Sequence, residues 1–202
     1  YPGPEIKIDK SLERKGYKPL GRGEGGPGGG PVAPPGNYQV CFKLDDKEYK
    51  HSFKILKDPR LDTTSEDFAA QFELWNKITK RVSETNVAIN SIRRIMSQIE
   101  ELLSRDTLSN TSSQKSEKKV RKNAEMLLGK LKILENELTQ TKNETPSDRL
   151  RHPAMLKERM EALVSNVSVA DSVPPQQAYD VFEHLSMQID QKLKQMNLVC
   201  EK

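Results

Sequence analysis

The sequence contains few cysteines, few aromatic residues and no long apolar run. Its 202 residues include only two cysteines, Cys41 and Cys200, which are too few for a disulfide framework and lack metal-ligand spacing. A membrane-spanning helix needs roughly 18 consecutive apolar residues, and no stretch approaches that length. A disulfide scaffold, a zinc module and a membrane span are therefore not expected, whereas pairing of Cys41 with Cys200 stays open.

Motifs that carry catalysis are also missing. None of the three histidines, His51, His152 and His184, has a neighbour at metal-ligand spacing. Carboxylate pairs such as Glu100 with Glu101 are expected by chance among 29 acidic residues, and this pair flanks apolar positions as helix-surface charges do. No G-x-S-x-G, H-E-x-x-H or EF-hand motif occurs. We predict no catalytic, cofactor-binding or metal-binding residues, and no enzyme activity in this chain.

Basic and acidic residues are not concentrated in separate parts of the chain. The 33 basic and 29 acidic residues give a net charge of +4, and the signs are interleaved. The most basic run, Lys115 to Lys122, is interpreted as the solvated start of a helix in preference to a phosphate-binding patch. We expect no nucleic-acid partner.

Glycine and proline are concentrated near the start of the chain. The segment from Gly21 to Pro31 cannot form a helix or a regular strand, and it lacks the Lys-Ser/Thr of a P-loop, so it is predicted to be a loop or linker. A short strand is expected from Glu5 to Asp9. The abrupt start at Tyr1 indicates a fragment of a longer protein, so a missing targeting signal says nothing about location.

Two segments then alternate apolar and polar residues with a period of two. They run from Tyr38 to Leu44 and from Tyr49 to Ile55, and Asp45-Asp46 makes the reversal. This pattern predicts a β-hairpin with one buried face. Because two strands alone are marginally stable in water, we expect partner strands, either upstream of Tyr1 or on another chain.

The period becomes helical after Thr64. Thr64 and Asp67 resemble a capping box, and neither proline nor glycine interrupts the segment from Ser65 to Arg105. A helix of this length extends roughly 60 Å, so it needs partner helices along it. Aromatic residues on the first and last helices are candidate core or interaction anchors: Phe68, Phe72, Trp75, Tyr179 and Phe182.

Three more helices are expected after a polar connection at residues 106–116. The second has apolar residues spaced alternately four and three apart from Val120 to Leu138, and it ends near Asn143. The third runs from Pro153 to Val167, and Val173-Pro174-Pro175 opens the last. Short connections make neighbouring helices antiparallel. The predicted fold class is α+β but mostly α, with a β-hairpin region followed by an antiparallel helical bundle that contains a long helical hairpin.

Glycosylation signals are present as short triplets. N-x-S/T sequons begin at Asn110, Asn143 and Asn166. A polar chain of this length contains such triplets by accident, so we interpret them as chance unless the host glycosylates secreted proteins.

Several stretches together resemble the C-terminal region of large secreted bacterial proteins that carry sortilin-like or BNR (Asp-box) β-propeller repeats, often labelled glycosyl-hydrolase-like. The stretches are Tyr1-Pro2-Gly3 and residues 32–40, 53–60, 67–72, 83–90 and 177–185. The resemblance implies that residues 1–60 are the end of an Ig-like or fibronectin-like β-domain and that residues 61–202 are a helical tail. It also implies an exported protein, extracellular or periplasmic. The Asp-box itself, S-x-D-x-G-x-x-W, is absent, so no propeller chemistry is carried over.

These patterns favour a non-catalytic structural or protein-interaction module at the C-terminal end of a larger exported β-propeller protein. The alternative is the accessory end of a secreted hydrolase acting on glycans or peptides, with its active site upstream of this chain. The expected partners are upstream domains of the parent chain, together with another protein or a second copy bound through the helices.

Overall fold

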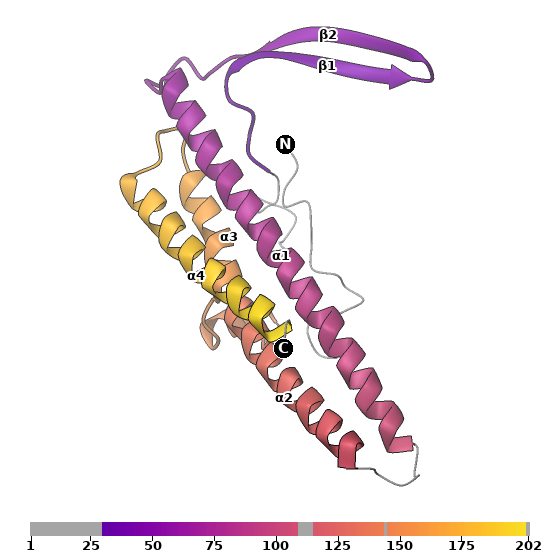
Figure 1. The fold of residues 1–202 in the computed structure, drawn as a ribbon. Helices are drawn as coiled ribbons and strands as arrows, with labels where there is room; N and C mark the ends of the chain where they lie inside the picture. Colours follow the sequence, from indigo (N-terminus) through magenta and orange to yellow (C-terminus); the bar gives the residue numbers. More distant parts are fainter. Residues whose placement is uncertain (1–29, 109–114, 144, 201–202) are drawn as a thin grey trace.

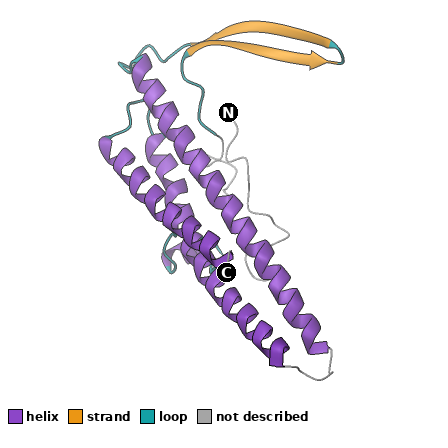
Figure 2. Ribbon diagram, in the orientation of Figure 1, coloured by secondary structure: helices purple, strands orange, loops and turns teal. Residues whose placement is uncertain are grey.

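The computed structural model describes residues 30–108, 115–143 and 145–200. Within them the chain forms one antiparallel β-hairpin followed by four packed helices, which confirms the mostly helical fold class (Figures 1 and 2). The elements are β1 (Gly36–Leu44), β2 (Lys47–Ile55), α1 (Ser65–Leu108), α2 (Lys115–Leu138), the 3-10 helix η2 (Pro146–Leu150), α3 (Leu156–Val167) and α4 (Gln176–Cys200). The strand expected at residues 5–9 and most of the glycine-rich segment lie outside the described residues.

The reversal of the hairpin falls at Asp45 and Asp46, as the sequence predicts. These residues join two nine-residue strands, and Leu44 pairs directly with Lys47. Asp45 has a φ of 52°, in the left-handed region. Aspartate adopts this conformation more readily than β-branched or bulky residues do, which explains a tight turn without glycine.

α1 begins with the capping box expected from Thr64 and Asp67. The backbone N–H of Asp67 donates to Thr64 Oγ1 at 3.2 Å, and the N–H of Thr64 donates to Asp67 Oδ2 at 3.0 Å. The Thr64 carbonyl accepts a helical hydrogen bond from the N–H of Phe68. The hydrogen bonds from Thr64 hold the pKa of Asp67 below its ordinary value, because they stabilise the ionised carboxylate.

The four helices are arranged around the 44 residues of α1 (Figure 1). α2 lies antiparallel beside the C-terminal half of α1, and α3 and α4 pack beside the N-terminal half. Lys192 of α4 forms an ion pair with Glu137 near the end of α2, at 2.9 Å. All four helices therefore meet near the middle of α1.

One apolar core cluster runs through the bundle, because each helix turns a stripe inward. Its buried members include Leu74, Ile78, Val82, Ile89, Ile92 and Met96 of α1, Leu131, Leu134 and Leu138 of α2, Leu156, Met160 and Leu163 of α3, and Ala178, Leu185 and Ile189 of α4. The predicted stripe of α2 is thus buried from Leu131 onward. Val120, at the other end of the same stripe, is exposed, since α3 and α4 do not extend to that end of the bundle (Figure 1).

The boundaries of α1 and α2 differ from the prediction. α1 continues past Arg105 to Leu108, and α2 ends at Leu138 instead of near Asn143. After Leu138, Thr139 Oγ1 donates to Glu158 Oε1 at 2.6 Å, and the N–H of Gln140 donates to Glu158 Oε2 at 3.1 Å. These bonds to a residue of α3 draw the backbone out of the helix, so the end of α2 is set by tertiary contacts.

The connection from α2 to α3 contains η2, which the sequence pattern did not predict. The N–H of Thr145 donates to Asp148 Oδ2 at 2.8 Å and closes the first turn of η2. α3 begins at Leu156 and not at Pro153, since Met155 stays extended and donates its N–H to Glu158 Oε2 at 3.2 Å. α4 begins at Gln176, directly after the two prolines.

Candidate functional site

The pairing register divides the hairpin into two chemically different faces. Residues directly opposite each other in an antiparallel pair point to the same side of the sheet. One side, called the apolar face below, carries the pairs Tyr38–Phe53, Val40–His51, Phe42–Tyr49 and Leu44–Lys47. The other side, the polar face, carries Asn37–Lys54, Gln39–Ser52, Cys41–Lys50 and Lys43–Glu48.

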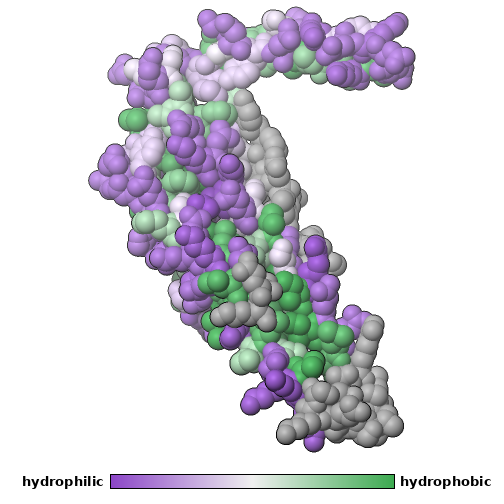
Figure 3. Space-filling model, in the orientation of Figure 1, coloured by the Kyte–Doolittle hydropathy of each residue, from purple (hydrophilic) through white to green (hydrophobic). Residues whose placement is uncertain are grey.

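The apolar face is exposed in the described structure, and the partner strands expected to cover it, either upstream of Tyr1 or on another chain, stay a prediction. Phe42 is 57% exposed and Tyr49 is 55% exposed. No Cα atom of either strand lies within 8 Å of a Cα atom of a described helix. The hairpin extends away from the bundle beyond the N-terminal end of α1, and hydrophobic surface remains visible on it (Figure 3). Among the described residues, the period-two pattern therefore forms two paired strands with no second layer over their apolar face.

Two aromatic pairs order the apolar face. The rings of Tyr38 and Phe53 stack with centroids 5.8 Å apart, and the rings of Phe42 and Tyr49 lie 6.4 Å apart. Tyr38 Oη also donates to the carbonyl of Pro34 at 2.6 Å. Cross-strand aromatic pairs stabilise a hairpin, so contacts within the hairpin itself order this face.

The base of the hairpin is tied to the bundle through its linker. Arg60 donates from Nη2 to Asp58 Oδ2 at 2.6 Å, and this hydrogen bond lowers the pKa of the Asp58 carboxyl. Lys57 Nζ donates to the Thr63 carbonyl at 3.0 Å, and Thr63 Oγ1 donates to the carbonyl of Asp171. The linker thus contacts the α3–α4 connection, which anchors the hairpin at this end of the bundle.

A buried ion pair crosses the bundle where the four helices meet. Arg93 Nε of α1 lies 2.6 Å from Glu135 Oε1 of α2, with side-chain exposures of 3% and 1%. The sequence suggested no buried member among its carboxylate pairs, so the burial of Glu135 was missed. The carboxylate faces a guanidinium inside the core, which suits a structural link between α1 and α2 better than proton transfer.

The five predicted anchors lie at the hairpin end of the bundle. Phe68 and Trp75 of α1 are buried and Phe72 is partly buried. Tyr179 and Phe182 of α4 are partly buried and pack against the core. Trp75 belongs to the apolar core cluster that Tyr179 and Phe182 pack against, whereas Phe68 and Phe72 lie outside that cluster.

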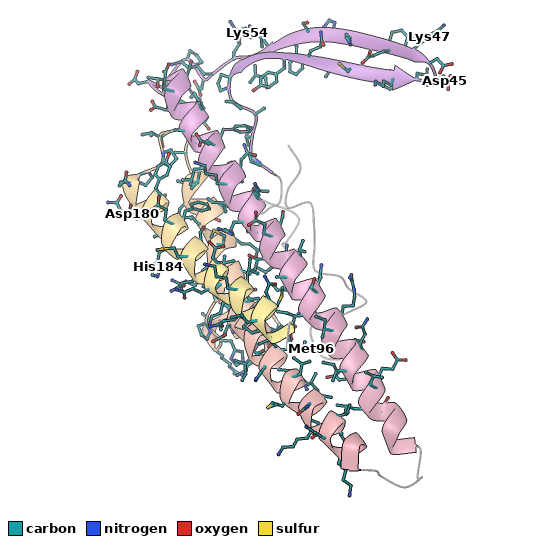
Figure 4. The ribbon with its side chains drawn as sticks, in the orientation of Figure 1. Asp45, Lys47, Lys54, Met96, Asp180 and His184 are labelled. Atoms are coloured by element: carbon teal, nitrogen blue, oxygen red, sulfur yellow. The ribbon has the colours of Figure 1, made fainter. Side chains whose placement is uncertain are left out.

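The remaining polar candidates do not converge. His51 and His184 are exposed, with His184 Nε2 at 3.1 Å from Gln188 Nε2, and His152 is partly buried. Figure 4 shows His184 on the outer side of α4. Cys41 is an exposed free thiol on the polar face. Within the described residues, no group of three His, Cys, Asp or Glu side chains could hold a metal ion.

The described residues of the sequons and of the basic run are either buried in the bundle or exposed on its surface. Asn143 is buried, which leaves no room for a glycan there, whereas Asn166 is exposed on α3. Asn110 lies outside the described residues. From Lys118 to Lys122 the side chains are exposed at the start of α2, in keeping with a solvated helix start.

A second apolar surface is visible near the C-terminal end of α4 (Figure 3). Leu198 is exposed there, while Met196 and Val199 are partly buried and pack against the core. This surface continues the bundle core. Self-association through the helices stays a prediction.

Comparisons of the chain with protein-family models, with curated proteins and with solved structures found no match. Among the described helices, none has a stretch long and apolar enough to cross a membrane.

Proposed function

We propose that this chain is a non-catalytic protein-interaction module. The helical bundle supports the hairpin, and the apolar face of the hairpin docks on a β-layer of another domain. The observation that carries this role is an ordered apolar sheet face that no described helix covers. Contiguous exposed apolar surface of this kind marks interaction sites in soluble proteins.

The gain from covering this face is large enough to hold a partner. Five large side chains of the apolar face are about half exposed: Val40, Phe42, Leu44, Tyr49 and Phe53. Complete burial of one such side chain contributes about 1.5–3 kcal/mol. Burial of the exposed halves therefore contributes about 4–8 kcal/mol before the entropic cost of association.

The partner layer is proposed to be a β-domain of the same exported parent protein, as the resemblance to sortilin-like and BNR repeat proteins implies. Two sheets of a β-sandwich pack face to face with their apolar sides inward, and the hairpin has the alternation that such packing requires. The chain would then be the C-terminal end of the parent, extracellular or periplasmic. If the parent is a secreted hydrolase, the chain is its accessory end.

Thiol labelling tests the docking. With Cys41 and Cys200 replaced by serine, Phe42→Cys reports on the apolar face and Gln39→Cys is the matched control on the polar face. Both positions are exposed in this chain, so both thiols should react at similar rates here. In the parent protein, the thiol of Phe42→Cys should react at least about tenfold more slowly than in this chain, because burial blocks access to the thiolate.

Gln39→Cys should keep its rate in the parent protein, since the polar face stays in solvent. Equal rates for Phe42→Cys in this chain and in the parent would contradict the proposed docking.

A further inference from the structure

We infer that the outer edge of β2 pairs antiparallel with β2 of a second copy of this chain, giving a four-stranded sheet with a two-fold axis at His51. This contact uses the strand edge and is independent of the docking proposed for the apolar face. Within the described residues the sheet has two strands, so β2 has β1 on one side and no strand on the other. Such an edge presents backbone N–H and C=O groups that pair readily with another strand.

β2 is complementary to itself when His51 lies opposite His51 of the second copy. Glu48 then lies opposite Lys54 of the second copy, and symmetry makes this opposite-charge pair twice. Tyr49 lies opposite Phe53 of the second copy, also twice. Opposite-charge and aromatic pairs directly across two strands each stabilise the pairing. The charged pairs lie on the polar face and the aromatic pairs on the apolar face, so both faces are matched at once.

Neighbouring registers place like charges together. A shift of the pairing is allowed only if residues of the same face stay opposite each other. Any other shift would place the apolar face of one copy beside the polar face of the other. A register centred on Lys50 sets this lysine against its own copy, and one centred on Ser52 sets Lys50 against Lys54. The register centred on His51 avoids both contacts and overlaps all nine residues of β2.

The edge of β1 lacks this complementarity. Its one charged residue is Lys43, which would face the neutral Asn37 in the equivalent symmetric register. In the β2 pairing, by contrast, the tip of one hairpin lies beside the base of the other. Figure 4 shows Asp45 and Lys47 at the tip and Lys54 nearer the base, so the acidic turn of each copy lies near the basic base of its neighbour.

Disulfide trapping tests the register. With Cys41 and Cys200 replaced by serine, His51→Cys places two thiols across the axis at a Cα spacing of about 4.5–5.5 Å, which a disulfide spans. We expect a covalent dimer under mild oxidation. Val40→Cys, on the same face but on β1, is the matched control and should stay monomeric. A monomeric His51→Cys, or an equal yield of dimer from Val40→Cys, would overturn the inference.

A mixed reaction checks that the polar faces also match. Glu48→Cys and Lys54→Cys chains should link to each other when mixed. Neither should link to itself, because in this register the same residue of the two copies is separated by about 20 Å along the strands. Equal linking of each variant with itself would rule out the proposed register.

Charge reversal gives an equilibrium measurement. Lys54→Glu turns both attractive pairs into repulsive ones, while its neighbour within the hairpin, Asn37, is uncharged. The dimer dissociation constant, measured by sedimentation equilibrium, should rise about tenfold. A mixture of Lys54→Glu chains with Glu48→Lys chains should favour mixed dimers, because each pair is again of opposite charge. An unchanged dissociation constant for Lys54→Glu would contradict the inferred contact.

Discussion

The hairpin and the bundle carry amphipathic patterns of similar clarity, but only the bundle buries its apolar side. Ile78 of α1 is fully buried, whereas Phe42 of β1 is more than half exposed. Helices can cover one another's stripes within one chain, while a two-stranded ribbon has no second layer of its own. Apolar periodicity therefore predicts whether a segment is a helix or a strand, but it does not show where the layer that covers its apolar side lies.

The two regions also differ in what their polar contacts accomplish. In the bundle, Arg93 and Glu135 form an ion pair inside the core and link two helices. In the hairpin, Glu48 and Lys50 form an ion pair in solvent, at 3.4 Å. A solvent-exposed pair contributes little to stability, so this ion pair adds little to the stability of the hairpin.

The largest effect is expected at the buried ion pair of the bundle. Arg93→Met or Glu135→Leu alone should lower the free energy of unfolding by about 3–5 kcal/mol, because each breaks the buried ion pair and leaves one of its two charges in the core. The double variant should recover most of this loss, since an apolar pair fills similar volume without charge. Urea unfolding followed by circular dichroism at helical wavelengths measures both. A double variant as unstable as the single ones would contradict a paired role.

A matched pair of truncations compares the regions directly. Ile78→Ala should lower the free energy of unfolding of the bundle by about 2–5 kcal/mol, because it opens a cavity in the core. Phe42→Ala removes a larger side chain but should leave the helical transition unchanged, since neither strand approaches a described helix. Thermal unfolding monitored by the helical signal gives both values. A clear loss of helical stability in Phe42→Ala would show that the hairpin packs on the bundle.

A smaller effect is expected at the start of α1. Thr64→Ala removes the capping hydroxyl and should cost about 1 kcal/mol, whereas Thr64→Ser should keep most of the cap. The folded state lowers the pKa of Asp67, so the capping contribution is present at neutral pH and is lost as the pH falls below about 4. Unfolding curves at neutral and acidic pH should show a smaller acid-induced loss for Thr64→Ala than for Thr64→Ser. Equal losses would argue against the cap.

Local signals predicted the parts of the fold that local chemistry decides. The reversal at Asp45-Asp46 and the capping box of Thr64 with Asp67 depend on residues close in sequence, and both are confirmed. The helical stripe around Trp75 is confirmed for the same reason, because a helix turns residues three to four apart to one side.

Features set by distant contacts were missed. The end of α2 depends on the hydrogen bonds that Glu158 accepts from Thr139 and Gln140, and no helix-stop residue in the sequence indicates this end. The burial of Glu135 depends on Arg93, which lies in another helix. The exposure of Phe42 depends on the absence of a covering layer among the described residues, and alternation alone carries no information on that layer.

Amide hydrogen exchange, resolved to individual residues, tests most directly whether the hairpin is energetically separate from the bundle. Amides of α1 from Leu74 to Met96 should exchange only on global unfolding, because they lie in the core. Amides of β1 and β2 should exchange many times faster in dilute solution, and their rates should not follow the urea dependence of the helices. Strand amides that exchange together with those of α1, at the same free energy, would contradict a hairpin that is energetically separate from the bundle.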